Sequence, residues 1–397
     1  MTSLRDGDIP SQWRNAKIIP LKKPGKSDYT LAKSWRPISL LSTLGEILEA
    51  VIAERLSYAV ETFGLLPGNH FGARKRRSTE QALLLLQEQI YKAWRARKVL
   101  SLISFDVKGA YNGVFKDRLL QRLRARGIPD AVQKIDANRG SIAFVDDYTA
   151  WVTGPSAEAN RAGIQAIIDR ALDWERRSGA QFESDKTAII HFTRNKERSS
   201  EQPFSVKGDM VKPTESAKIL GVVMDRELRY KQHIARTAAK GLAAALALKR
   251  LKMLSPRTAR QLAQKIGALA ITGAFGTAAT AVVEAEASIY PIRERHTQAA
   301  VRLWINIHTL PGSHPLAVKK IRTTVRFVSP LQKLARAVEG TEVDRMETIQ
   351  EYAVLPWEPR LRPTVEADRA RAAEKVDKAT GILIATSSAE PVSASSN

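Results

Sequence analysis

The sequence predicts an α+β fold in which a β-α-β-β-α-β unit is followed by a mostly helical region. The first observation is the order of apolar patterns between residues 99 and 192, where strand-like and helix-like segments alternate as in a split βαβ motif. The second is the helical periodicity that dominates beyond Gly221. The third is composition, because 397 residues with 44% hydrophobic side chains can bury a sizeable core.

The N-terminal part is expected to form a strand and two helices. Ile18–Leu21 is a short apolar run that precedes a Lys/Pro/Gly turn, which indicates a strand. The apolar spacing across Ser42–Phe63 is typical of an amphipathic helix. Ser78 and Gln81 have the spacing of a capping box, so a second helix should begin there and run to about Arg95.

The central unit brings acidic residues toward one edge of a sheet. Its expected elements are strand Val99–Val107, helix Phe115–Arg126, strands Ser141–Phe144 and Tyr148–Val152, a helix capped by Ser156 that reaches Ser178, and strand Thr187–Phe192. Because crossovers are right-handed, the second strand should run parallel to the first. Asp106 at the end of the first strand should then converge with Asp146 and Asp147 in the following turn.

The C-terminal part is expected to be helical and then highly charged. Its predicted features are helices at 230–253, 257–275, 291–308 and 329–338, a charged segment Pro363–Lys378, a short strand Ile382–Ile384 and a low-complexity, disordered end at Ser387–Asn397. The uncharged stretch Ile266–Val283 is built from small residues that gain little in lipid, so we expect a packed helix there and no membrane span.

Charge and cysteine content restrict the function classes. A net charge of +22, with a pI of about 10.2, favours a polyanionic partner, usually nucleic acid. The basic residues are spread over several elements rather than along one amphipathic helix, which disfavours a membrane surface. Absence of cysteine excludes disulfides, thiolate zinc sites and a cysteine nucleophile. Residues 1–10 show no secretory pattern, so we expect an intracellular location, in the nucleus or the cytoplasm.

The clustered carboxylates suggest a magnesium site. Like charges a few ångströms apart repel, which favours protonation of one carboxyl group or a cation between them. Mg²⁺ prefers hard oxygen ligands, and two ions about 3.5–4 Å apart can hold the attacking and leaving oxygens of a phosphoryl transfer. Asp146 and Asp147 alone could be ordinary turn residues. Together with Asp106 and the basic surroundings, they favour nucleotidyl transfer.

Several segments, in a consistent order, resemble motifs of one family. FDVKGAYN at residues 105–112 and FVDD at 144–147 resemble the two catalytic motifs of reverse transcriptases from non-LTR, LINE-like retrotransposons. The other segments that resemble this family are WRPISLL at 35–41, FGAR at 71–74, residues 182–190 around Lys186, and residues 220–233 at the primer grip and thumb entry. The helical remainder is similar to that of fungal elements, in which a ribonuclease H domain follows where this chain stops.

The resemblance implies a right-hand polymerase architecture with fingers, palm and thumb. The boundaries we expect are 1–98 for the fingers, 99–228 for the palm, 229–355 for a helical thumb and connector, and 356–397 for a charged, partly disordered tail. It also implies an RNA template, a DNA primer and dNTP substrates, with two Mg²⁺ ions, for which Mn²⁺ could substitute. The oligomeric state is left open.

The resemblance also implies roles for individual residues. Asp106 and Asp146 would bind the metal pair, with Asp147 as a supporting carboxylate. The remaining roles are Tyr111 as the steric gate against a ribose 2′-hydroxyl, Lys22 and Arg36 as triphosphate contacts, and Lys186 as the proton donor to pyrophosphate. Alternatives stay open, namely solvation for Lys22 and Lys186, a turn brace for Arg36 and core filling for Tyr111.

The chain departs from the family between the two catalytic motifs. Residues 108–143 do not resemble the Gly/Pro/Ser-rich stretch and helix that position template and incoming base, and a second gap lies near Leu262. These gaps suggest internal deletions or missing exons. We therefore expect a reverse transcriptase of reduced polymerising ability, because small misplacements of reacting groups can cost about 10²-fold in rate. The alternative is a non-catalytic, basic nucleic-acid-binding protein.

Overall fold

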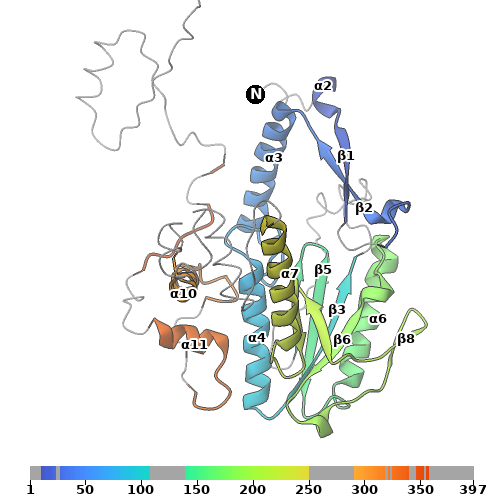
Figure 1. Cartoon of the computed structure of the whole chain (residues 1–397), viewed down its shortest axis with the longest axis vertical. Helices are drawn as coiled ribbons and strands as arrows, with labels where there is room; N and C mark the ends of the chain where they lie inside the picture. The colour runs from blue at the N-terminus through green and yellow to red at the C-terminus, as the bar shows by residue number, and fades with distance from the viewer. Residues whose placement is uncertain are drawn as a thin grey trace, which may run out of the picture. The chain divides into compact units, whose positions relative to one another are not determined.

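The computed structural model describes residues 10–23, 27–107, 139–249, 290–317, 321, 324–338, 346–352 and 355–356. The chain divides into two compact units, Met1–Ala353 and Val354–Asn397, and every element below lies in the first (Figure 1). Within the described ranges, no helix combines the length and the apolar character needed to cross a bilayer. The finer domain boundaries given above stay predictions.

The N-terminal strand prediction is confirmed, and a second strand pairs with it. β1 (Lys17–Lys22) and β2 (Trp35–Leu40) form an antiparallel hairpin. The short helix α2 (Ser11–Arg14) precedes this hairpin, and the 3₁₀ turn η1 (Ala32–Ser34) lies between its strands. All six residues of β1 are exposed, so the hairpin is stabilised by its ladder rather than by a core.

Helix α3 (Thr43–Thr62) confirms the predicted helix but exposes many of its apolar residues. It begins where Ser42 Oγ accepts a hydrogen bond from the Gly45 backbone N–H. The predicted amphipathic spacing would suit burial of one face, yet Leu44 and Ile47 are each 56% exposed. The helix is therefore supported by its cap and by its ends rather than by a continuous packed face.

Helix α4 (Thr79–Arg95) confirms the predicted capping box. Ser78 Oγ accepts from the Gln81 N–H at 3.2 Å, and Gln81 Oε1 accepts from the Ser78 N–H at 3.1 Å. The helix buries Leu86 and Ile90.

The central sheet has the predicted topology. Its strands are β3 (Val99–Asp106), β4 (Arg139–Phe144), β5 (Asp147–Gly154) and β6 (Ala188–Phe192), in the spatial order β4-β5-β3-β6. β5 is antiparallel to both β3 and β4, so β3 and β4 run parallel as expected. The predicted helix 115–126 lies outside the described residues.

Helix α6 (Arg161–Ser178) begins later than predicted. Ser156 Oγ accepts from the Ala159 N–H at 3.1 Å, so it caps a turn that precedes the helix and not the helix itself. The buried Asn160 stands between the two, with its side-chain amide donating to Val99 O and Ser101 Oγ. The predicted end at Ser178 is confirmed, and Gly179 follows with φ of 75°.

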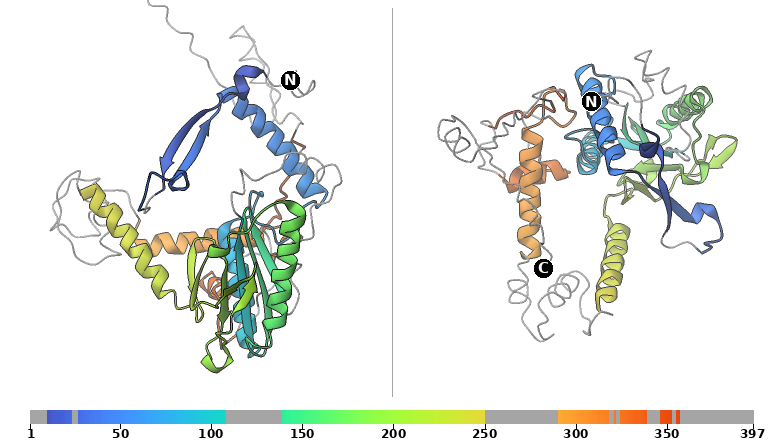
Figure 2. Two further views of the ribbon diagram at one scale, coloured as in Figure 1. Left: turned by 90° about the vertical axis from the view of Figure 1, so that its right-hand side faces the viewer. Right: turned by 90° about the horizontal axis from the view of Figure 1, so that it is seen from above.

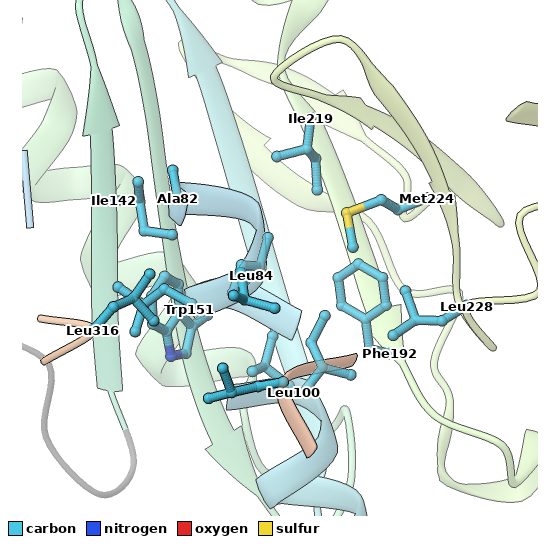
Figure 3. Packing of buried hydrophobic residues seen from close by; sticks show 14 of the residues in the cluster. Ala82, Leu84, Leu100, Ile142, Trp151, Phe192, Ile219, Met224, Leu228 and Leu316 are labelled. Atoms are coloured by element: carbon cyan, nitrogen blue, oxygen red, sulfur yellow. The ribbon is translucent and has the colours of Figure 1, made fainter. Parts of the chain in front are cut away.

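Two hydrophobic clusters cover the two faces of the sheet. α4 packs on one face and α6 on the other (Figures 1 and 2). The α4 side includes Trp151, Leu100 and Phe192, and Figure 3 shows these with residues from β9 and β10. The α6 side includes Ile103 and Phe105. Burial on both faces explains why β3 is mostly apolar on both sides, with Ser101 and Ser104 as its polar interior residues.

Smaller strands and helices follow the sheet. They are the 3₁₀ turns η2 (Ser184–Lys186) and η3 (Lys196–Arg198), strands β7 (Phe204–Val206), β8 (Asp209–Val211), β9 (Ser216–Ile219) and β10 (Val222–Asp225), and helices α7 (Lys231–Lys249), α10 (Ile292–His308) and α11 (Pro330–Ala337). The last three confirm predicted helices. The predicted helix 257–275, the stretch 266–283 and all features expected beyond residue 356 lie outside the described residues.

Candidate active site

Two aspartates lie opposite each other at one edge of the sheet. Asp106 is the last residue of β3, Asp147 is the first residue of β5, and the two are direct partners in the antiparallel ladder. Side chains of directly opposed residues lie on the same face and close together. The apolar run of β3, including Phe105 at 1% exposure, fixes this register.

Asp146 lies in the tight turn beside them. Phe144 pairs with Asp147, so Val145 and Asp146 form a two-residue turn between β4 and β5. Val145 has φ of 56°, which is unusual for a β-branched residue. The Asp146 carbonyl accepts a hydrogen bond of 3.3 Å from the Val107 N–H, just beyond Asp106. The prediction that these segments meet at one sheet edge is confirmed.

The electrostatics of Asp147 reflect this arrangement. Burial raises its pKa, and the negative charges of Asp146 and Asp106 raise it further. Lys218 and Lys186 act in the opposite direction. Ionising all of these carboxyl groups together is therefore unfavourable, and a bound cation would relieve the repulsion.

Lys186 supplies a positive charge at the site. It ends the η2 turn, and its Nζ donates to Asp106 Oδ2 at 2.7 Å and also pairs with Glu183. These hydrogen bonds raise the Lys186 pKa to about 12, so the amine is protonated at neutral pH. The sequence did not single out Glu183, although its i,i+3 spacing from Lys186 was a usable signal.

The donors suit magnesium in kind. Asp106, Asp146 and Asp147 offer hard carboxylate oxygens of the type that Mg²⁺ prefers. Among the residues that the structure describes, however, no group of three or more Asp, Glu, His or Cys side chains is arranged to hold a metal ion. The described residues thus offer the type of oxygen ligand that Mg²⁺ prefers, but they do not form a three-ligand metal site. Lys186 Nζ is bonded to Asp106 instead.

The remaining predicted residues lie elsewhere or are not described. Lys22 Nζ stacks over the rings of Tyr29 and Trp35, at 5.2 and 5.5 Å from their centroids. Arg36 is exposed and faces Leu21 across the β1–β2 hairpin. Both cations therefore belong to one hairpin, separate in sequence from the aspartates. Tyr111 lies outside the described residues.

Sequence reasoning gave Gly72 and Asn69 no structural role. Phe71, between them, donates its N–H to Ala143 O at 2.7 Å, so this segment adds to the outer edge of β4. The motif FGAR was recognised, but nothing in it indicated which strand it would contact.

Opposed carboxylates at the edge of a split βαβ sheet, beside a protonated lysine in a strongly cationic chain, are groups of the kind that metal-dependent nucleotidyl transfer uses. Comparison with known proteins agrees with this class. Residues 21–137 match the family described as reverse transcriptase (RNA-dependent DNA polymerase). This range of the chain is thus similar to part of a reverse transcriptase domain, and the match includes Asp106 and ends before Asp146.

Three similar relatives are described as polymerases of mobile elements from Drosophila melanogaster. "Probable RNA-directed DNA polymerase from transposon BS" is 22% identical over 59% of this chain, "Probable RNA-directed DNA polymerase from transposon X-element" is 24% identical over 65%, and "RNA-directed DNA polymerase from mobile element jockey" is 24% identical over 57%. The aligned parts span 32%, 34% and 31% of these relatives, so the chain corresponds to about a third of their length.

Proposed function

We propose that this chain is the polymerase portion of a non-LTR retrotransposon reverse transcriptase, with RNA-templated DNA synthesis as its reaction. The observation on which this depends is the opposition of Asp106 and Asp147 across β3 and β5, with Asp146 in the adjoining turn. The family match and the polymerase names of the relatives support the same reaction. The substrates are then an RNA template, a DNA primer and dNTPs.

The proposed chemistry assigns each described residue a task. Asp106 and Asp146 would hold divalent metal, Mg²⁺ or Mn²⁺, and Asp147 would support them through its charge. The metal supplies Lewis acidity toward the primer hydroxyl and the triphosphate when bound. Lys186, kept protonated by its carboxylate partners, offers a proton near the departing pyrophosphate. Because Lys186 Nζ donates to Asp106 Oδ2, a metal ion bound at that oxygen would compete with the lysine.

The assignment of fingers, palm and thumb belongs to the same proposal. The β1–β2 hairpin with α3 would form fingers, the central sheet the palm, and the helices from α7 onward a thumb and connector. Lys22 and Arg36 on the hairpin would contact the incoming triphosphate, and Tyr111 would exclude the ribose 2′-hydroxyl. The helices from α7 onward are also the basis for proposing that the element is of the fungal type.

We further propose that polymerisation is weak. The connection between Val107 and Arg139 is shorter than the family resemblance calls for, and it lacks the template-positioning stretch. Catalysis depends on holding reacting groups to within about 1 Å, and a misplacement of that size can cost about 10²-fold in rate. Internal deletion would therefore reduce extension more than it reduces binding.

A primer-extension assay tests both statements. The wild-type chain, the Asp146→Asn variant and an Asp185→Asn control are compared on a homopolymer RNA template with a DNA primer, using Mg²⁺ or Mn²⁺. Asp185 is an exposed acidic residue next to Lys186, so its replacement controls for charge. Weak, template-dependent extension that only Asp146→Asn abolishes is expected.

Other outcomes overturn one part or the other. Robust extension would contradict the proposed weakness and leave the reaction intact. Absence of extension, with nucleic-acid binding that is unchanged by Asp106→Ala, would replace the enzyme by a basic binding protein. Binding in either case should weaken steeply with salt, by roughly 10³–10⁵ between 50 and 200 mM if about 6–10 phosphates are neutralised.

A further inference from the structure

The segment from Asn69 to Gly72, called here the 69–72 segment, lies along the outer edge of β4. The Phe71 N–H donates to Ala143 O at 2.7 Å, and the Ala143 N–H donates to Asn69 O at 3.2 Å. His70 and Ala143 form an isolated parallel bridge. The segment thus continues the hydrogen bonding of the sheet beyond its edge strand, immediately before the turn that contains Asp146.

The side chain of Asn69 strengthens this pairing. Its Nδ2 donates to Ser141 O at 2.7 Å and to Ser141 Oγ at 3.2 Å. Both residues are buried, with Asn69 5% and Ser141 0% exposed. Buried amide hydrogen bonds of this kind are costly to break without replacement, so the start of the segment is held firmly.

At the other end of the segment, Gly72 touches the backbone of the turn. A Cβ atom added to Gly72 would meet the Val145 backbone nitrogen first, with Val145 Cγ2 at 2.6 Å and Phe144 C at 2.9 Å. Real Cβ atoms essentially never approach other atoms below 3.0 Å. Any other residue at position 72 therefore forces the segment and the turn apart.

Of the 69–72 segment and the turn at Val145 and Asp146, the turn is the more easily displaced. The 69–72 segment cannot retreat easily, because Phe71 is 0% exposed and Arg74 is bound to the Glu61 carboxylate on α3. Val145, in contrast, is 43% exposed and already has a left-handed backbone conformation. Displacement by a side chain at position 72 will therefore fall mainly on Val145 and the adjoining Asp146.

We propose that Gly72 is a positioning residue for the catalytic turn. The absence of its side chain lets the 69–72 segment press against Val145, which sets the place of Asp146 beside Asp106. Mutual repulsion among the site carboxylates tends to spread the turn, and the segment opposes that spreading. This inference rests on the proposed function for its kinetic consequence, but its structural part stands on the contacts alone.

The test compares Gly72→Ala with a matched glycine in the same loop. Gly68 has room for a methyl group, since its added Cβ would find no atom nearer than Ser313 O at 3.8 Å. Gly72→Ala should lower the kcat of primer extension by about 10²-fold, with little change in the KM for dNTP and with a lower melting temperature, because the added Cβ would meet backbone atoms. Gly68→Ala should leave all three unchanged.

Hydrogen exchange gives a readout that does not depend on polymerase activity. In Gly72→Ala, amides of residues 139–148 should exchange faster, while those of β3 and β6 keep their protection. Asn69→Ala should accelerate the same peptide more mildly, which covers the case in which Gly72→Ala does not fold. A Gly72→Ala protein with wild-type exchange at 139–148, or a kcat equal to that of Gly68→Ala, would overturn the proposal.

The two proposals fail in different ways. If the wild-type chain does not extend a primer, the proposed function is wrong. The role of Gly72 is then tested by the hydrogen exchange of residues 139–148 alone. If extension is normal but exchange does not respond to Gly72→Ala, the proposed function stands and the positioning role is wrong.

Discussion

The ion pair between Arg74 and Glu61 offers a sharp test of how the motif loop is anchored. Arg74 Nε donates to Glu61 Oε1 at 2.7 Å and Nη2 to Oε2 at 2.6 Å. Arg74 Nη1 also donates to the carbonyls of Pro67 and His70, at 2.8 and 3.1 Å. The two side chains are only 6% and 11% exposed, so the pair is largely shielded from water.

Removing one partner should therefore cost far more than removing both. Arg74→Ala leaves the buried Glu61 carboxylate without its partner and removes one donor each from the carbonyls of Pro67 and His70, which should lower the free energy of unfolding by about 3–5 kcal/mol. Glu61→Leu with Arg74→Met replaces the pair by apolar side chains, a change that is often close to neutral. Arg74→Lys keeps the charge but loses the fork of donors, so we expect an intermediate cost.

Urea denaturation of the three variants and the wild type measures these differences. Arg176→Ala is the control, because its pair with Asp173 is exposed, at 78% and 46%, and such pairs contribute about 0–1 kcal/mol. The reasoning is refuted if Arg74→Ala costs no more than Arg176→Ala, or if the double variant is as unstable as Arg74→Ala. In either case the loop would be held by something other than this pair.

Three further predictions concern stability. Asp147→Asn should stabilise the protein at neutral pH, because the raised pKa of Asp147 means that ionisation of its carboxyl group disfavours the folded state. When unfolding is measured as a function of pH, this gain in stability should vanish as the pH falls toward the ordinary pKa of 3.8. Burial lowers the His191 pKa from 6.5 to about 4, so stability should fall by about 3 kcal/mol as the pH drops through that window and then level off; an NMR titration of His191 near 6.5 would contradict this. Gly140→Ala should cost about 1–3 kcal/mol in urea unfolding, since its Cβ would lie 2.5 Å from the buried Trp151 ring; an unchanged midpoint would show that the ring can move.

The sequence predicted well those features that depend on nearby residues. The capping box of Ser78 and Gln81 needs only residues three apart, and it forms as expected. The meeting of Asp106 with the Asp146 turn followed from strand order and crossover handedness. The start of α6 was misplaced because Ser156 has the spacing of a cap, yet its hydroxyl closes an earlier turn.

What the sequence could not provide are contacts between distant segments. The Lys186 to Asp106 ion pair joins residues 80 apart, and the fit of Gly72 against Val145 depends on backbone proximity that no local pattern encodes. The apolar spacing of α3 indicated a buried face, whereas Ile47 is 56% exposed. Periodicity specifies that a helix forms, but the presence of a partner surface decides whether its apolar face is covered.

The turn that contains Asp146 is held to its neighbours mainly through peptide groups. Val107 reaches Asp146, and Phe71 pairs with Ala143, in each case by main-chain hydrogen bonds. Such main-chain bonds make no demand on side-chain identity, in contrast to the bonds that the Asn69 side chain donates to Ser141. Gly72 does make such a demand, because only a residue without a Cβ atom lets the backbone pass this close to Val145 and Phe144.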